Sequence, residues 1–225
     1  KSIYQQDQGG VMNGWLQVNS VFDTIQGEGP YVGTPATFIR LALCNLQCPM
    51  CDTEYSTFEE VAVRELVRQC LVIGNELVVI SGGEPMRQNI SSLCKELLEA
   101  GFKVQVETNG TIYQPLDSAV MIVCSPKDTF IARGLHKHVY AYKYVLHHKS
   151  VSEIDGLPLL ALANGLAGGQ VARPPVDFPK GQIYLQPADT GVEEINQRNL
   201  KVCIDNVMEY GYRLCLQTHK IIGVE

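Results

Sequence analysis

The chain has 225 residues, of which 45% are hydrophobic and 19% charged, and its formal net charge at pH 7 is −6. This length and composition indicate one domain with a large apolar core. The acidic balance and the lack of a basic run argue against binding to nucleic acid or an anionic membrane surface by bulk charge. No apolar run reaches the roughly 18 residues that would predict a membrane-spanning helix.

Eight cysteines are spread along the chain. Five stand singly in apolar surroundings and are expected to be buried, unreactive thiols: Cys70, Cys94, Cys124, Cys203 and Cys215. Unpaired thiols of this kind are typical of a reducing compartment, so a cytoplasmic location is expected.

The predicted elements begin after a polar lead-in over residues 1–14, which is expected to be loosely ordered and to leave residues 15–225 as a single domain. Apolar patterns with strand periodicity predict strands over Trp15 to Phe22, Ala36 to Leu43, Glu76 to Ser81, Lys103 to Val106, Ala119 to Val123, Val139 to Leu146, Ile183 to Leu185 and Arg213 to Leu216.

Three helices are predicted between these strands. The capping-box pattern Thr57-Phe58-Glu59-Glu60 predicts a helix that continues through Cys70. A second covers Ile90 to Ala100 and ends at Gly101, and a third covers Glu193 to Tyr210. Residues 150–181 are interrupted by glycine and proline, so a short helix or strand followed by a loop is expected there.

Polar or glycine-rich motifs follow the carboxyl ends of several predicted strands, such as Gly82-Gly83-Glu84-Pro85 and Ser125-Pro126-Lys127. In α/β barrels these ends form one active-site face. A complete eight-fold barrel usually needs about 250 residues. This shorter chain therefore predicts an α/β fold with a partial, open TIM-like barrel of about six or seven core strands and few helices.

Three cysteines form a C-x3-C-x2-C motif directly after the second predicted strand, at Cys44, Cys48 and Cys51. Three thiolates so close in sequence can bind one side of a four-iron cluster and leave one iron without a cysteine ligand. A disulfide with a spare thiol, or a structural zinc site completed by a distant ligand, would use the same residues.

The cysteine motif, followed by Gly82-Gly83-Glu84-Pro85 at the end of the next predicted strand, resembles the radical S-adenosylmethionine superfamily. That resemblance implies a 4Fe–4S cluster whose open iron binds S-adenosylmethionine, and a radical that abstracts hydrogen from the substrate. Further motifs resemble the 7-carboxy-7-deazaguanine synthases from about Val18 onward: Gln26-Gly27-Glu28-Gly29, Gly33, Arg40, Cys51-Asp52-Thr53, Ser125-Pro126-Lys127, Gln186-Pro187 and Gln217-Thr218-His219-Lys220. The resemblance implies a carbon–nitrogen lyase of queuosine and 7-deazapurine biosynthesis, which contracts the ring of 6-carboxy-5,6,7,8-tetrahydropterin and releases ammonia.

The resemblance also implies a role for each matching residue, with Cys44, Cys48 and Cys51 on the cluster and Thr53 supplying an oxygen to Mg²⁺. The residues implied in substrate binding are Ile25, Gln26, Gly27, Glu28, Arg40, Ser81, His219 and Glu225. Those implied in binding S-adenosylmethionine are Gly83, Glu84, Ser125, Pro126, Lys127, Gln186, Pro187, Ala188 and Asp189. No side chain is expected to act as the catalytic group, because the cluster and cofactor generate the radical.

Each of these assignments depends on the whole set of motifs. Taken alone, Arg40, Lys127 and His219 would be ordinary surface or structural residues. Arg40 suits the substrate carboxylate because a guanidinium group can donate two parallel hydrogen bonds to it. Met50 departs from the pattern, since it stands where radical enzymes often have an aromatic residue near the adenine; a thioether can fill that space.

The family further implies a homodimer and an electron donor such as flavodoxin. Two alternatives remain at this point. One is an activase that makes a glycyl radical on a partner protein, which shares the cysteine spacing. The other is a non-catalytic iron–sulfur or zinc protein that binds or senses a partner.

Overall fold

A single curved sheet links nearly all of the described chain, which in this computed structural model comprises residues 14–49, 51, 53–162 and 169–225. The sheet has nine strands in the order β3-β1-β2-β4-β5-β6-β7-β8-β9. The strands are β1 (Trp15–Ile25), β2 (Pro35–Leu41), β3 (Glu59–Ala62), β4 (Leu77–Gly82), β5 (Lys103–Thr108), β6 (Met121–Cys124), β7 (Val139–Leu146), β8 (Ile183–Pro187) and β9 (Arg213–Leu214). The α-helices among the described residues are α1 (Val63–Ile73), α2 (Ser91–Glu99), α3 (Glu193–Tyr210) and α4 (Thr218–Ile222).

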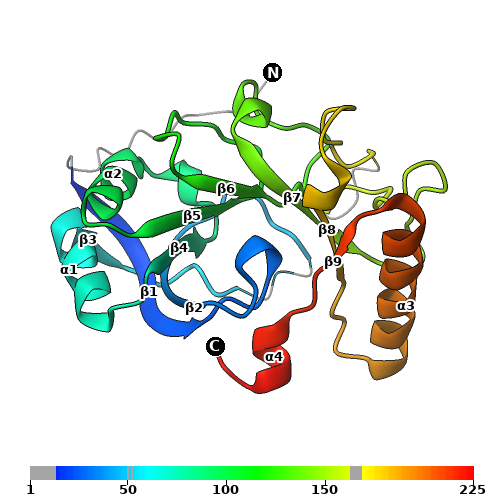
Figure 1. The fold of residues 1–225 in the computed structure, drawn as a ribbon, viewed down its shortest axis with the longest axis horizontal. Helices are drawn as coiled ribbons and strands as arrows, with labels where there is room; N and C mark the ends of the chain where they lie inside the picture. The colour runs from blue at the N-terminus through cyan, green and yellow to red at the C-terminus, as the bar shows by residue number, and fades with distance from the viewer. Residues whose placement is uncertain (1–13, 50, 52, 163–168) are drawn as a thin grey trace.

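Seven of these strands, from β2 through β4 to β9, pair in parallel with their neighbours. Strands β1 and β3 extend the sheet antiparallel beyond β2. The sheet curves round without pairing its two edge strands, β3 and β9 (Figure 1). The partial, open barrel with six or seven core strands is thereby confirmed.

The two faces of the curved sheet differ in chemistry because successive side chains of a strand point to opposite sides. Val104 and Val106 of β5 and Tyr142 and Tyr144 of β7 belong to the main apolar core, which also contains buried residues of α1 and α2. The alternate positions put polar groups, including Glu107 and Lys143, on the inner face. The apolar face thus anchors the helices, and the polar face is left for a ligand.

The capping-box pattern at Thr57 to Glu60 gave a wrong boundary. Residues Glu59–Ala62 form β3, which pairs antiparallel with Trp15 to Val18, and α1 begins only at Val63. The N-cap of α1 is Ala62, which has no capping side chain. The open edge of β1 offers main-chain partners to this segment, and that pairing wins over the local helix signal.

The remaining elements lie close to their expected positions. The β7 and α3 ranges are as predicted, and α2 ends before Gly101. The described part of 150–181 contains two isolated bridges, one between Val151 and Pro158 and one between Leu160 and Gln170, and a 3-10 turn begins at Lys180. Part of the apolar stretch where a short helix or strand was expected, residues 163–168, lies outside the described residues. The tail after β9 forms α4, which the sequence did not predict.

Two expectations fall wholly or mainly on residues outside the described ranges, namely the loose lead-in over residues 1–14, of which 1–13 are not described, and the packing of Met50.

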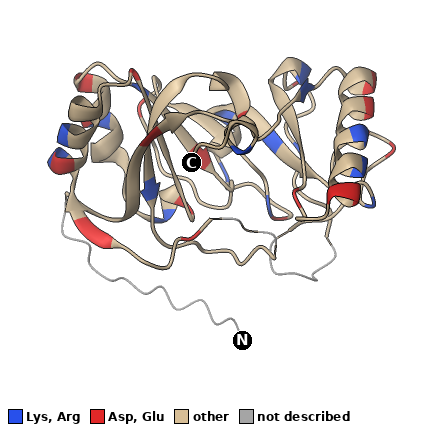
Figure 2. Ribbon diagram, turned by 90° about the horizontal axis from the view of Figure 1, so that it is seen from below, with Lys and Arg blue, Asp and Glu red and all other residues tan. Residues whose placement is uncertain are grey.

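The outer helix α3 carries acidic residues towards both ends and basic residues between them, and Glu194 pairs with Arg198 and Asp205 with Lys201 (Figure 2). Among the described residues, no helix combines the length and apolarity that crossing a membrane requires.

Candidate active site

One cavity of about 590 Å³ opens on the inner face of the sheet, at the carboxyl ends of the parallel strands. Its size is that of a small-molecule site. Of the residues singled out from the sequence, those that line it are Ile25, Gln26, Gly27, Glu28, Arg40, Cys44, Cys48, Cys51, Thr53, Ser81, Gly83, Ser125, Lys127, Gln186, Pro187, Asp189, His219 and Glu225. Segments far apart in the sequence thus converge on one space.

Three of the singled-out residues do not line this cavity: Glu84, Pro126 and Ala188. All three are buried, and Glu84 is fully so. The Glu84 carboxylate accepts hydrogen bonds from the main-chain N–H groups of Asn109 (2.7 Å) and Met86 (3.0 Å) and from the Thr108 hydroxyl (2.8 Å). In this structure Glu84 therefore ties the ends of β4 and β5 together beneath the cavity.

The cysteine loop leaves β2 through an unusual backbone conformation at Leu43, which has φ 69°. This left-handed conformation costs a non-glycine residue roughly 1–2 kcal/mol. It is held from both sides, since the Leu43 N–H donates to Tyr55 O (2.9 Å) and Leu43 O accepts from Glu84 N (2.9 Å). Functional sites often keep such strain where neighbours enforce it.

The loop is braced by groups that follow the next two strands. Arg87 donates to the Cys44 carbonyl (2.9 Å), and Asn109 donates to the Asn45 side chain (3.1 Å). Gly83 allows a close approach of the loop, because a Cβ there would lie 2.1 Å from Leu43 O. The loop and the Gly82-Gly83 strand end can therefore meet only if residue 83 has no side chain.

All three loop cysteines are free thiols, and Cys51 is exposed. Burial raises the pKa of the Cys44 and Cys48 thiols. Among the described residues, no three cysteine, histidine or carboxylate side chains are close enough to share one metal ion. The donor set nevertheless fits a four-iron cluster with one open iron, since three thiols of one loop line the cavity, whereas the other five cysteines are buried and do not line it. The predicted burial of those five is confirmed.

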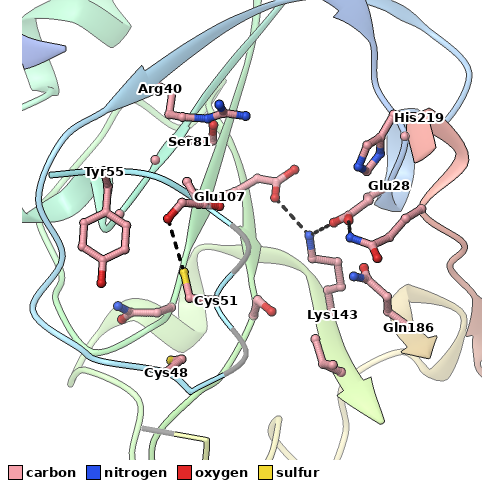
Figure 3. Close-up of a pocket in the computed structure, with 18 of the residues that line it drawn as sticks. Glu28, Arg40, Cys48, Cys51, Tyr55, Ser81, Glu107, Lys143, Gln186 and His219 are labelled. Carbon is pink, nitrogen blue, oxygen red and sulfur yellow. Dashed lines mark hydrogen bonds and ion pairs between the residues drawn. The ribbon is translucent and has the colours of Figure 1, made fainter. Parts of the chain in front are cut away.

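Arg40 and Ser81 lie next to each other because they are register partners in the parallel pair β2–β4 (Figure 3). The Arg40 guanidinium lies over the Phe22 ring, 4.8 Å from its centroid, and pairs with Glu225 Oε1 at 3.2 Å. The Thr24 hydroxyl donates a hydrogen bond to a main-chain oxygen of Glu225 (2.5 Å). The guanidinium thus already binds one carboxylate at the position assigned to a carboxylate of the substrate.

A buried ion-pair network forms the opposite wall of the cavity (Figure 3). Lys143 Nζ contacts Glu28 Oε2 and lies 3.0 Å from Glu107 Oε2. The exposed fractions of these side chains are 7% for Lys143, 14% for Glu28 and 20% for Glu107. Burial opposes the charge of Lys143, yet the two carboxylates raise its pKa well above the ordinary value, so it stays a cation.

Lys127 contacts the Ser125 hydroxyl at 2.5 Å. Burial, together with repulsion from Lys143, lowers the pKa of Lys127. The Ser125-Pro126-Lys127 motif thus delivers a partly desolvated cation toward the cavity, where an anionic or electron-rich group would stabilise it.

Helix α4 brings His219 against the glycine-rich turn. Thr218 N donates to Gly27 O (3.0 Å), and a Cβ on Gly27 would lie 2.0 Å from His219 Nδ1. Lys220 reaches Asp189 at 3.1 Å. The pKa of Asp189 falls to about 2, chiefly because its carboxylate accepts a hydrogen bond from Gly191 N–H.

Sequence reasoning gave no role to several polar groups that line the cavity, among them Glu107, Asn109 and Lys143. Lys143 had a visible signal, as the single charge in the apolar strand VYAYKYVL. Glu107 closes β5 in the motif Glu107-Thr108-Asn109-Gly110, which follows the same strand-end rule as the motifs that were singled out.

No protein-family model matches the chain. The 7-carboxy-7-deazaguanine synthase of Rickettsia prowazekii is 39% identical to it over 223 residues, covering 93% of this chain and 89% of that protein. The 7-carboxy-7-deazaguanine synthase of Rhodospirillum rubrum is 37% identical over 224 residues, covering 93% of this chain and 92% of that protein.

Among solved structures, QueE from Escherichia coli matches with a TM-score of 0.68 over 90% of this chain and 93% of that chain. At 23% sequence identity, this match shows a common fold. The two sequence relatives are similar along nearly their whole length and share the name expected from the motifs, so the chain belongs to the 7-carboxy-7-deazaguanine synthase family of radical S-adenosylmethionine lyases.

Proposed function

We propose that this protein converts 6-carboxy-5,6,7,8-tetrahydropterin to 7-carboxy-7-deazaguanine with release of ammonia, as a step of queuosine biosynthesis. The observation that carries the proposal is the single cavity that joins the three loop thiols to Arg40 and Ser81 on one wall and Glu28 and Lys143 on another. A site for the cluster alone would not need these polar side chains on the other walls of the cavity.

The residues divide by chemistry between cofactor and substrate. Cys44, Cys48 and Cys51 would hold the 4Fe–4S cluster, and when bound, cluster and S-adenosylmethionine together supply the radical that abstracts hydrogen. The lining residues proposed for S-adenosylmethionine are Gly83, Ser125, Lys127, Gln186, Pro187 and Asp189. Buried Glu84, Pro126 and Ala188 would support that site from beneath.

The substrate would be oriented by its two ends. Arg40 would take its carboxylate, with Ser81 beside it, and Thr53 would supply an oxygen ligand to a Mg²⁺ ion. Ile25 to Glu28 and His219 would take the pterin ring, whose amide and amino edge needs matched donors and acceptors. This fixed orientation matters because a hydrogen-abstraction step requires the reacting carbon to be held close to the cofactor.

Turnover under anaerobic conditions tests the proposal. The reconstituted protein is supplied with reductant, S-adenosylmethionine and the carboxy-tetrahydropterin, beside Cys51→Ala and the control Cys70→Ala, which removes a thiol buried away from the cavity. We expect the deazapurine product from wild type and Cys70→Ala and none from Cys51→Ala. Deoxyadenosine formation without a deazapurine product would contradict the proposal.

The same preparation distinguishes the two alternatives. One zinc and no sulfide would favour a non-catalytic metal protein, whereas a glycyl-radical activase would cleave S-adenosylmethionine without turning over the pterin. The homodimer, the flavodoxin-type donor and the cytoplasmic location stay predictions, for which light scattering, reduction by purified flavodoxin and cell fractionation are the direct measurements.

A further inference from the structure

Lys143 joins two carboxylates that come from distant parts of the chain. Glu28 belongs to the turn after β1 and Glu107 to the end of β5, and Lys143 projects between them from β7 (Figure 3). The remaining carboxylate oxygens are also engaged: Glu107 Oε1 by the amides of Gln26 (3.0 Å) and Gln105 (2.9 Å), and Glu28 Oε1 by Gln217 (3.0 Å). The network is therefore fixed in position.

Each of these carboxylates still has acceptor capacity, because its two oxygens carry about four lone-pair sites. Both groups line the cavity. Together with Lys143 they leave one net negative charge on this wall. The wall thus presents ionised acceptors to any ligand, and it suits a ring edge that carries N–H donors.

Without the cation, the two carboxylates would repel each other, and this repulsion favours a proton on one of them. Protonation changes an acceptor into a donor, so the wall would no longer match an N–H edge. The other titratable or charged groups that face this network are Lys127, Cys215 and His219.

We propose that Lys143 is a specificity-determining positioning residue, which holds Glu28 and Glu107 as a pair of ionised acceptors and so selects a ring with the 2-amino, N3–H edge of a pterin. This inference rests on the proposed function, since it concerns the ring end of the same site. It predicts that discrimination between ring edges, rather than cofactor cleavage, depends on Lys143.

The test compares two unreactive ligands on the reconstituted protein with S-adenosylmethionine bound. Pterin-6-carboxylate keeps the 2-amino donor, and lumazine-6-carboxylate has a carbonyl acceptor in its place. The variants are Lys143→Met, Lys143→Arg and, as the matched control, Lys201→Met, whose lysine pairs with Asp205 on the exposed side of α3.

Wild type and Lys201→Met should bind the pterin roughly 10- to 100-fold more tightly than the lumazine, the range expected for a hydrogen bond to a charged group. Lys143→Met should lose most of that preference. Lys143→Arg should keep it. A merely structural role would weaken both ligands equally, and that result would overturn the proposal.

If Lys143→Met does not fold, Glu107→Gln can be used, because it replaces one carboxylate oxygen with an NH2 donor and removes the charge while leaving the lysine in place. It should lose the preference to a similar extent, and an unchanged preference there would equally refute the inference. If the proposed function itself is wrong, the result is distinguishable from these outcomes, because wild type would then bind neither the pterin nor the lumazine.

Discussion

The Arg40 guanidinium combines a cation–π contact with Phe22 and an ion pair with Glu225. Arg40→Met keeps an unbranched apolar side chain of similar length but removes the guanidinium and with it both contacts. We expect the KM for the substrate to rise at least about 10-fold, because a charge-assisted hydrogen bond is lost. The rate of deoxyadenosine formation without substrate should change little.

The control for this variant is Arg213→Met. Arg213 also lies over an aromatic ring, that of Tyr184 at 5.8 Å, but it does not line the cavity. Equal losses of substrate turnover and substrate-free cleavage in Arg40→Met would argue against a carboxylate clamp.

Glu84 makes the stability of the unloaded protein depend on pH. Burial raises the pKa of Glu84 to about 7, although hydrogen bonds from Asn109, Thr108 and Met86 act in the opposite direction. Because the folded chain holds this proton more tightly than the unfolded chain, the stabilising effect is complete below about pH 4.5 and is lost as pH rises through about 7.

The pKa difference corresponds to a contribution on the order of 3 kcal/mol. We expect the free energy of unfolding of wild type, measured relative to Glu84→Gln in urea titrations, to fall by about this amount between pH 4.5 and pH 8. A difference that stays constant over that range would show that Glu84 has an ordinary pKa.

At the scale of elements, the contact between the cysteine loop and the end of β4 depends on residue 83 being a glycine. Gly83→Ala would place a Cβ 2.1 Å from Leu43 O, so the loop or the strand end must shift. We expect this variant to bind less iron and sulfide per chain after reconstitution and to lose activity in proportion.

Gly181→Ala is the matched control, because a Cβ there meets nothing within 4 Å. It should reconstitute like wild type. Full cluster content in Gly83→Ala would mean that the loop tolerates displacement from β4.

The elements also show what could be predicted from the sequence. The strand ends that carry contiguous motifs were found, because Cys44 to Cys51, Gly82 to Pro85 and Ser125 to Lys127 each concentrate unusual residues after an apolar run. The pairing of Glu59–Ala62 with β1 was missed, because a local capping pattern says nothing of a distant strand edge. Lys143 was missed for the related reason that its partners, Glu28 and Glu107, are neighbours only in the folded chain.

At the scale of the whole molecule, the cavity is bounded by segments from the first strand to the last helix, so its ligand should stabilise the entire fold. A ligand at 100 times its Kd adds about 2.7 kcal/mol to the free energy of unfolding. For a chain of this size that corresponds to a rise in Tm of roughly 5–10 °C.

We expect S-adenosylmethionine at that concentration to give this shift in anaerobic thermal unfolding of the reconstituted protein. Cys51→Ala should show little shift, since it lacks one of the ligands proposed for the cluster. An equal shift in both proteins would mean that the cofactor is held without the cluster.

Because three cysteines lie in the loop and five are buried, the number of thiols that react in the native chain should report whether the loop holds its cluster. Burial raises the pKa of Cys70, Cys94, Cys203 and Cys215 to about 12, and that of Cys124 higher still, so these thiols react slowly with alkylating reagents. Cys51 is exposed and Cys44 and Cys48 are only partly buried, so labelling of the native chain should be confined to these three thiols when the loop is free and fall toward none when it is fully loaded. Mass spectrometry after a brief pulse of iodoacetamide would read the fraction of loaded molecules directly, without reference to colour or activity.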